Sequence, residues 1–227
     1  MLVGPAEPAS GAVSCMAMTN PADLIAPRGL NFGPLGPNWV HLCIDMQRMF
    51  AEETEWHAPW MEQVLPHVLR LVEMRPERSV FTRFIPPRSA DEVGGTWHRY
   101  YQRWVSMTRE RLDSGLLELV PALARHVPPA RVLDKPIYSP WLGSRLHADL
   151  LAARVDTVVI SGAETEVCVM AAVIGAIDLG YRVIIATDAI CSSADSTHEA
   201  MEHVYDSRFG MQVETAEVGE IVEAGGQ

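Results

Sequence analysis

Residues 157–180 constrain the fold more than any other stretch of this chain. The stretch opens with the β-branched run Thr157-Val-Val-Ile160, which predicts a short strand buried on both faces. Residues 167–179 are then rich in alanine and aliphatic side chains, and Gly180 follows them, as is typical of a helix that ends at a glycine. A buried strand, a tight turn and a helix form the repeating unit of parallel α/β sheets.

Cys168 falls in the first turn of this predicted helix, with Thr165 as its candidate N-cap. Unpaired N–H groups and the positive end of the helix dipole favour a thiolate there, so the position predicts a nucleophile. The alternative is an inert packed thiol, because cysteine is among the most buried residue types. Glu164 and Glu166 oppose activation, since nearby negative charge raises a thiol pKa. An activated Cys168 therefore requires a cation from elsewhere in the chain.

The rest of the chain repeats the alternation of strands and helices. Further strands are predicted over residues 39–44, 79–84, 131–134, 181–186 and, as an edge strand, 211–218. Helices are predicted up to residue 75 with Pro66 in the first turn, after Gly94 and Gly95, over 116–126, after the cap Ser144, and over 193–207. This order predicts an α/β fold: a single-domain, doubly wound, mostly parallel sheet of about six strands with helices on both faces.

The ends of the chain differ in character from this core. Residues 1–38 are rich in proline, glycine and alanine and lack periodicity, so we expect an extended N-terminal arm. The folded domain is then predicted over residues 39–219, and residues 220–227 form a C-terminal tail. The arm has neither the basic start nor the apolar core of a signal peptide, and no later span is long enough to cross a membrane.

Charge and cysteine usage exclude several classes of function. A net charge of −11 argues against binding to nucleic acid or to an anionic membrane surface. The four cysteines are scattered without a CxxC pair or zinc-ribbon spacing, which favours a reducing, cytoplasmic setting. No GxGxxG follows the first predicted strand, so a dinucleotide-binding loop is excluded there.

Two further reactive side chains end predicted strands. Asp45 follows strand 39–44, and Lys135 follows strand 131–134 immediately before a proline. Taken singly, Asp45 is compatible with an ordinary turn or capping aspartate, and Lys135 with a solvated surface charge. Parallel strands place their carboxyl ends on one edge of the sheet, however, where open α/β sheets bind ligands. Asp45, Lys135 and Cys168 can therefore converge although they lie far apart in the sequence.

Three motifs in this order resemble those of the isochorismatase-like cysteine hydrolases. They are Leu42-Cys-Ile-Asp-Met-Gln47, Asp134-Lys-Pro-Ile-Tyr-Ser-Pro-Trp141 and Ser161-Gly-Ala-Glu-Thr-Glu-Val-Cys-Val169, and the run Gly180 to Ala189 fits as well. The family includes N-carbamoylsarcosine amidase, nicotinamidase, ureidoacrylate hydrolase and biuret hydrolase. The likeness extends over about residues 39–217, nearly all of the predicted domain.

The resemblance implies a catalytic triad of Asp45, Lys135 and Cys168 that hydrolyses a C–N bond of a small amide, imide or ureide. Cys168 would form an acyl-enzyme, Asp45 would act as general acid and base, and Lys135 would supply the missing cation. We hypothesise that Lys135 decides the charge balance at the thiol. The family's cis peptide bond corresponds to Ala163–Glu164, and it would aim the N–H groups of Glu164 and Cys168 at the oxyanion.

Departures from the family pattern narrow these expectations. Isochorismatases that cleave a vinyl ether do not use the cysteine, so its presence favours amide chemistry. Nicotinamidases bind a metal through Asp-x-His after their second strand, whereas this chain has Thr82-Arg83-Phe84 followed by prolines. We therefore predict no metal and no cofactor. A small-molecule substrate and a homodimer or homotetramer are the expected partners.

Candidate substrate-binding residues come from the same motifs and from one aromatic helix. On that helix Trp97, Tyr100, Tyr101 and Trp104 share one face, which is compatible with a core, a subunit contact or a substrate cage. Arg83 would suit either a carboxylate clamp or a salt bridge. Glu164 is larger than its counterpart in many relatives, and its side chain has no assigned role. The candidates are Gln47, Phe50, Arg83, Trp97, Tyr101, Tyr138 and Trp141.

Three other functions stay open at this stage. The fold is compatible with a metal-dependent nicotinamidase-type hydrolase or with a non-catalytic binding module, although the intact triad argues against the latter. A redox-sensing thiol would need a resolving cysteine, for which only Cys43 and Cys191 are candidates, and both are predicted to be packed beside strands.

Overall fold

A computed structural model describes residues 27–225 of the chain, so the first 26 residues of the predicted arm and residues 226–227 lie outside the described part. Its centre is a six-stranded sheet in the order β3-β2-β1-β4-β5-β6, and every neighbouring pair is parallel. The strands are β1 (Trp39–Ile44), β2 (Ser79–Phe84), β3 (Arg131–Lys135), β4 (Thr157–Ala163), β5 (Arg182–Cys191) and β6 (Val213–Ala216).

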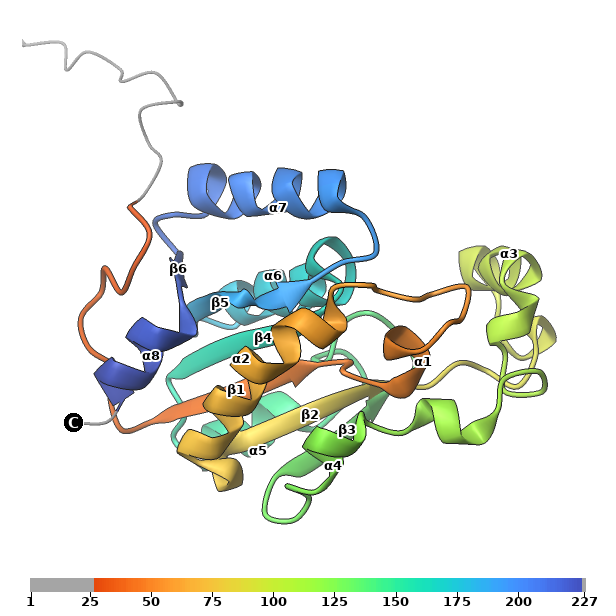
Figure 1. The fold of residues 1–227 in the computed structure, drawn as a ribbon, viewed down its shortest axis with the longest axis horizontal. Helices are drawn as coiled ribbons and strands as arrows, with labels where there is room; N and C mark the ends of the chain where they lie inside the picture. Colours follow the sequence, from red (N-terminus) through yellow and green to blue (C-terminus); the bar gives the residue numbers. More distant parts are fainter. Residues whose placement is uncertain (1–26, 226–227) are drawn as a thin grey trace, which may run out of the picture.

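The sheet is doubly wound about its central pair of strands. From β1 the chain moves outward through β2 to β3, returns to β4 beside β1, and then moves outward the other way to β6 (Figure 1). The switch point between β1 and β4 is where sheets of this kind place their ligands. The predicted fold class is therefore confirmed, and the last strand is indeed at an edge.

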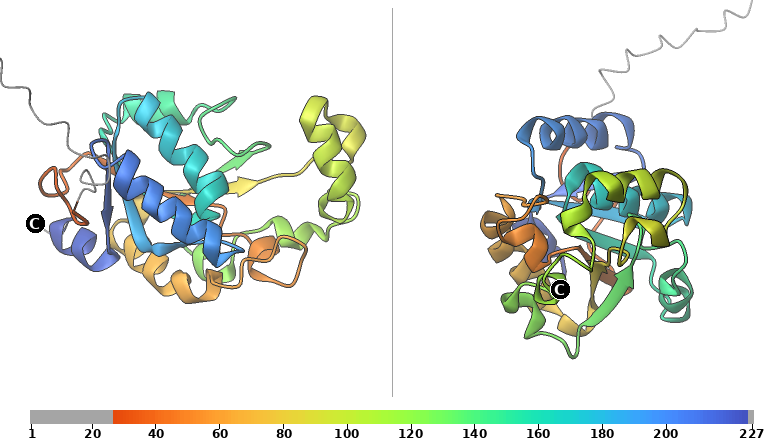
Figure 2. Two further views of the ribbon diagram at one scale, coloured as in Figure 1. Left: turned by 90° about the horizontal axis from the view of Figure 1, so that it is seen from above. Right: turned by 90° about the vertical axis from the view of Figure 1, so that its right-hand side faces the viewer.

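Helices cover both faces of the sheet (Figures 1 and 2). The α-helices are α1 (Arg48–Ala51), α2 (Met61–Met74), α3 (Gly95–Arg103), α4 (Pro121–Ala124), α5 (Leu146–Ala152), α6 (Met170–Asp178), α7 (Asp195–Arg208) and α8 (Val218–Gly225). One hydrophobic cluster joins α2, α4 and α8 to the sheet, and a second joins α5, α6 and α7 to it. Among the helices of residues 27–225, none is both long enough and apolar enough to cross a bilayer.

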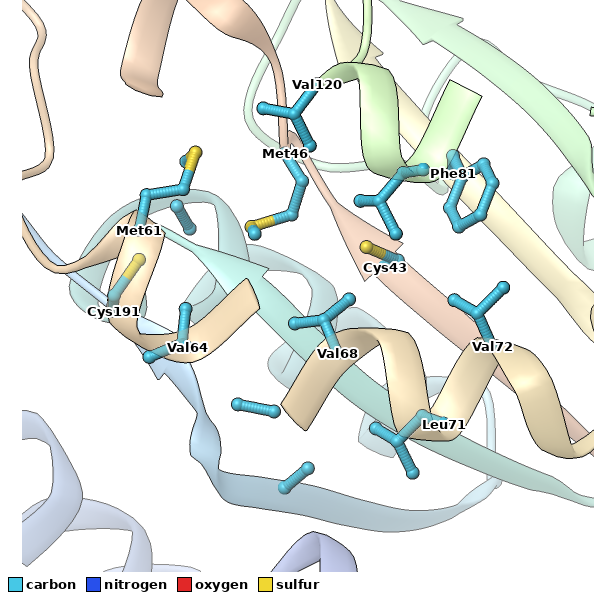
Figure 3. Packing of buried hydrophobic residues seen from close by; sticks show 14 of the residues in the cluster. Cys43, Met46, Met61, Val64, Val68, Leu71, Val72, Phe81, Val120 and Cys191 are labelled. Atoms are coloured by element: carbon cyan, nitrogen blue, oxygen red, sulfur yellow. The ribbon is translucent and has the colours of Figure 1, made fainter. Parts of the chain in front are cut away.

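Alternation along the strands explains the two clusters. On β1, Cys43 belongs to the α2 side, while Leu42 and Ile44 belong to the α6 side. Figure 3 shows α2 presenting Val68 and Leu71 to the sheet surface that carries Cys43. Because both faces are covered there, the central strands β1 and β4 are buried along their whole length, which is why the sequence predicted them well, whereas the edge strand β3 is largely exposed.

The described part of the arm packs along the β6 edge of the molecule. The Gly29 N–H donates to the Thr215 carbonyl at 2.7 Å. Arg182 pairs with the buried Glu214 carboxylate at 2.7 Å and donates to the Gly33 carbonyl at 2.6 Å. Residues 27–38 therefore pack along the surface of the domain through specific backbone contacts.

Local sequence rules misplaced several boundaries. The expected C-terminal tail over 220–227 begins inside helix α8, whose Ile221 is fully buried. The predicted helix over 116–126 is instead a 3-10 turn ending at Leu117 and the single turn α4, with Pro121 starting the new helix. Pro66 lies in the interior of α2, not in its first turn. In each case tertiary packing, which a local pattern does not contain, fixes where the chain turns.

A buried histidine on the central strand β1 contacts both neighbouring strands, β2 and β4. His41 on β1 is fully buried, with Nε2 2.7 Å from Ser161 Oγ on β4 and Nδ1 3.2 Å from Ser79 Oγ on β2. Burial lowers the pKa of His41 to about 3. The folded protein therefore keeps this ring neutral over a pH range in which the unfolded chain, near pKa 6.5, takes up a proton.

We expect this histidine to make the fold sensitive to acid. His41 stabilises the native state fully above about pH 6.5, and that stability is lost as the pH falls toward 3, at about 1.4 kcal/mol per pH unit. Urea unfolding of wild type and His41→Asn at several pH values between 7 and 4 measures this slope. His41→Asn should flatten it, whereas the exposed control His203→Asn should retain it. Equal slopes in all three proteins would contradict this assignment.

Candidate active site

The ends of three strands place the predicted triad at the carboxyl edge of the sheet. Asp45 follows β1, Lys135 ends β3, and Cys168 lies just after β4 in a π-helical turn, Thr165–Val169, that leads into α6. Because β2 separates β1 from β3, Lys135 has to reach across it. Its Nζ passes over the Phe84 ring at 5.1 Å from the centroid, a cation–π contact.

The Lys135 ammonium group bridges the other two side chains. Its Nζ donates to Asp45 Oδ2 at 2.6 Å, to Cys168 Sγ at 3.4 Å and to the Ile137 carbonyl at 3.2 Å. All three ammonium donors are thereby used inside the protein, and the Lys135 and Asp45 side chains are almost completely buried. The structure thus brings the three predicted residues together around one buried cation.

Thr82 fixes the other end of the Asp45 carboxylate. Its hydroxyl donates to Asp45 Oδ1 at 2.5 Å and accepts the Asp45 N–H at 3.0 Å. Asp45 itself has φ +50°, a left-handed conformation that a non-glycine residue adopts at a cost of about 1–2 kcal/mol. Sequence reasoning missed Thr82, and the available signal was a polar residue inside the otherwise apolar strand β2.

Gly162 allows β1 and β4 to meet closely beside the site. Its φ is +108°, and a Cβ at this position would lie 2.1 Å from the Ile44 carbonyl oxygen. Only glycine fits this backbone conformation and this distance. Ile44 immediately precedes Asp45, so the close approach sets the spacing between the acid and the loop that carries Cys168.

The turn that holds Cys168 differs from the predicted helix start. Thr165 is not an N-cap; its hydroxyl donates to the Cys191 carbonyl at 3.1 Å and lies 2.8 Å from His198 Nδ1. The Glu164 carbonyl accepts N–H groups from Val167 at 3.0 Å and from Val169 at 3.1 Å. A π-helical turn of this kind is frequent at functional sites. The peptide bond Ala163–Glu164 before it is cis.

The charge balance at the thiol differs from the expectation that Lys135 decides it. Burial, followed by the charge of Asp45, raises the pKa of Cys168 well above its ordinary value, while Lys135 lowers it by less. Burial alone would lower the pKa of Lys135, but the charges of Asp45 and Cys168 raise it overall. The resting site is therefore a neutral thiol beside a buried carboxylate–ammonium pair.

An aromatic layer lies over the triad, and α3 supplies much of it. In Figure 2, left, α3 stands beyond the carboxyl ends of the strands. The Trp97 ring lies 4.9 Å from the Tyr138 ring and 6.0 Å from the Tyr101 ring, measured between centroids. Tyr138 also stacks on Phe84 at 6.3 Å. Three predicted pocket residues, Trp97, Tyr101 and Tyr138, thus lie together near the triad.

The remaining predicted pocket residues have other partners. The side-chain amide of Gln47 donates to the carbonyls of Phe84 and Leu117 and accepts the N–H of Phe84, so all of these bonds are made within the protein. Phe50 is buried in the core, where its ring stacks on Trp56. Arg83 is held by two acidic partners, at 2.7 Å from Asp134 and 2.6 Å from Glu118, so it forms a salt bridge and not a carboxylate clamp.

Trp141 lies in the core on the α6 side of the sheet. Its indole N–H donates to the Ala172 carbonyl at 2.9 Å, and its ring stacks on Tyr181 at 5.6 Å. A Cβ on Gly175 would lie 2.2 Å from the Trp141 ring, so this glycine is what admits the indole. Trp141 therefore anchors the loop after β3 to α6.

Glu164 lies immediately before the turn that holds Cys168, and its carboxylate is partly buried. Its Oε1 accepts the Ser193 N–H at the start of α7 at 3.2 Å. Burial raises the pKa of Glu164, and the charges of Glu166 and Asp45 act in the same direction. The salt bridges within residues 27–225 give this carboxylate no cationic partner.

The residues at the end of β2 do not fit a metal ion. Thr82 is hydrogen-bonded to Asp45, Arg83 is a cation, and Phe84 lies against Lys135. Across residues 27–225, no three histidine, cysteine, aspartate or glutamate side chains are grouped closely enough to hold a metal. The threonine, arginine and phenylalanine side chains at the end of β2 therefore do not provide the carboxylate, imidazole or thiolate groups that bind zinc.

Comparison with curated proteins finds relatives of this chain. Maleamate amidohydrolase of Pseudomonas putida is 31% identical over 128 residues, which span 56% of this chain and 57% of that protein, so the match covers little more than half of either. A probable inactive nicotinamidase of Arabidopsis thaliana is 27% identical over 170 residues, 72% of this chain and 85% of that protein.

Solved structures show the same fold. A cysteine hydrolase from Pseudomonas syringae superposes with a TM-score of 0.74 at 19% identity, covering 88% of this chain and 97% of that one. The N-carbamoylsarcosine amidase of Thermoplasma acidophilum gives a TM-score of 0.66 at 20% identity, covering 81% and 98%. The family model for the isochorismatase domain matches residues 40–217. With that match over most of its length, the chain belongs to the isochorismatase family.

Proposed function

We propose that this protein is a cysteine-dependent amidohydrolase that cleaves a C–N bond of a small amide, imide or ureide. The observation that carries the proposal is the buried Lys135 ammonium group between Asp45 Oδ2 and Cys168 Sγ. A nucleophile, a proton acceptor and a cation in mutual contact are the components that acyl transfer through a thioester requires.

The first half-reaction would transfer the acyl group to sulfur. Asp45 takes the thiol proton of Cys168, and the thiolate attacks the carbonyl carbon of the substrate. The tetrahedral intermediate collapses as Asp45 returns that proton to the departing nitrogen, which leaves as ammonia or an amine. Lys135 keeps its proton throughout and stabilises the negative charge as it moves between Asp45 and the sulfur.

The second half-reaction would reverse the roles. Asp45 takes a proton from a water molecule, which attacks the thioester carbon and releases the carboxylic acid product. The sulfur departs as a thiolate and recovers its proton from Asp45. The raised pKa of Cys168 agrees with this cycle, because the thiol holds its proton until a substrate is positioned for attack.

Backbone N–H groups of Glu164 and Cys168 would stabilise the oxyanion. The Glu164 carbonyl accepts from Val167 and Val169, and the Cys168 N–H between them is not one of its donors. An N–H in the first turn of a helical segment, near the positive end of its dipole, is suited to hydrogen-bond a developing negative charge. One such donor typically contributes about 3–4 kcal/mol to lowering the barrier.

Ammonia release from a panel of small carboxamides, imides and ureides tests this function. We expect turnover of at least one panel member by the wild-type protein and no detectable turnover by Asp45→Asn. Dialysis against a chelator should leave the rate unchanged, because the end of β2 offers no ligands for a catalytic metal. Loss of activity on dialysis and its recovery with zinc, manganese or iron would point instead to a nicotinamidase-type metal enzyme.

A further inference from the structure

Helix α3 brings a buried and unpaired hydroxyl group to the aromatic layer above the triad. Tyr101 is only 1% exposed, yet its hydroxyl has no hydrogen-bond partner among the residues that the structure describes. The indole N–H of Trp56, whose ring lies 6.5 Å from that of Tyr101, is also buried without a partner in the described range. Buried polar groups of folded proteins are nearly always paired, so two orphan donors on one aromatic surface require an explanation.

The Tyr101 ring belongs to the aromatic layer beside the triad and lies 6.0 Å from the Trp97 ring. The Trp97 ring in turn lies 6.4 Å from Phe84, the ring against the Lys135 ammonium group. Burial raises the pKa of Tyr101, and the neighbouring groups Tyr138 and Cys168 raise it further, so the phenol stays protonated and acts as a donor near the nucleophile. The adjacent Tyr100 is different, because its hydroxyl is not among the buried groups that lack a partner within the described residues. Only one of the two neighbouring phenols on α3 is therefore left with an open donor.

The charges around this donor indicate what it binds. A carboxylate ligand would need a cation, but Arg83 is paired with Asp134 and Glu118, and Lys135 is committed to the triad. The partly buried Glu164 carboxylate would also repel a second anion, and its charge reaches Tyr100 and Tyr138. An uncharged oxygen acceptor meets neither difficulty.

We propose that Tyr101 is a specificity residue whose hydroxyl donates a hydrogen bond to a second, uncharged carbonyl oxygen of the substrate. This inference rests on the proposed amidohydrolase activity and narrows its substrates to neutral amides with another carbonyl near the bond that Cys168 attacks. A substrate that accepts a hydrogen bond from this donor binds more tightly than one that leaves the donor unpaired, and this difference is how a hydrogen-bonding site discriminates between substrates.

Matched substrates test the proposal. Malonamide and biuret carry a second neutral carbonyl, malonamate carries a carboxylate at the equivalent place, and butyramide has no second acceptor. Wild type should prefer the first two, and Tyr101→Phe should lower kcat/KM for them by about ten-fold or more relative to its effect on butyramide. A best substrate with a carboxylate or with no second acceptor would overturn the proposal, as would an equal loss on all four compounds or no loss at all.

A stability measurement separates this role from a structural one. Tyr101→Phe removes an unpaired buried hydroxyl, so its melting temperature should equal or exceed that of wild type. In the control Tyr205→Phe, a hydroxyl that donates to the Thr165 carbonyl at 2.9 Å is lost, and the melting temperature should fall. Destabilisation of Tyr101→Phe by as much as the control would overturn the inference. Wild type inactive on every amide of the larger panel would refute the proposed function itself, and the inference with it.

Discussion

Replacement of Cys168 by serine should lower kcat by about 10⁴-fold or more while leaving the fold intact. The serine hydroxyl is close to isosteric with the thiol, but Asp45 would then have to deprotonate an alcohol that is a much weaker acid and a poorer nucleophile. The Lys135–Asp45 pair at 2.6 Å does not depend on the sulfur, so the melting temperature should stay nearly unchanged. Steady-state ammonia release and a thermal melt of the same preparations measure both quantities.

Cys191→Ser provides the matched control for the nucleophile. Cys191 is also a free and buried cysteine at the carboxyl end of a neighbouring strand, but it has no contact with Lys135. We expect this variant to keep most of its turnover, with any loss reflected in the melting temperature. Similar losses in both variants, or retained activity in Cys168→Ser, would remove the covalent mechanism.

Lys135→Met should abolish activity and also destabilise the protein strongly. The substitution leaves the Asp45 carboxylate buried and without its cation, and breaking a buried ion pair in this way costs about 3–5 kcal/mol. At about 3 °C per kcal/mol, the melting temperature should fall by roughly 10 °C. Without Lys135, the positive charge that lowers the pKa of Cys168 is lost as well, so alkylation of the thiol by iodoacetamide should require a higher pH.

The double variant Asp45→Asn with Lys135→Met separates stability from catalysis. Both charges are then removed, and asparagine tolerates the left-handed backbone at position 45. Because the buried charge is gone, the double variant should recover most of the lost stability but none of the activity. If Lys135→Met were as stable as wild type, with an unchanged alkylation profile, Lys135 could not be the cation that bridges acid and nucleophile.

Elements with a strong local signature could be predicted from the sequence. The strands β1 and β4, which precede Asp45 and Cys168, are short apolar runs buried on both faces, so their ends could be placed before the structure was known. The edge strand β3 is largely exposed, and the proline after Lys135 marked its end. The rule that parallel strands end on one edge then brings residues 90 positions apart into contact, as the 2.6 Å distance between Lys135 and Asp45 shows.

Side chains whose partners lie far away in the sequence could not be predicted. Gln47 was expected to contact substrate, but its side-chain amide is hydrogen-bonded to the backbone of Phe84 and Leu117. Trp141 packs against Gly175 on another helix, and nothing near position 141 indicates that contact. The protonation state of Cys168 depends on how completely the site is buried, which helix-dipole reasoning does not include. The homodimer or homotetramer stays a prediction.

A covalent intermediate on Cys168 is the central claim, and mass spectrometry of the working enzyme tests it most directly. The best substrate of the panel would be mixed with excess enzyme, quenched in acid at intervals from milliseconds to seconds, and digested for peptide mapping. We predict a transient mass increase equal to the acyl portion of the substrate on the peptide that contains Cys168, formed together with the first equivalent of ammonia. Ammonia release with that peptide unmodified at every interval, or with the acyl group on another residue, would contradict the account.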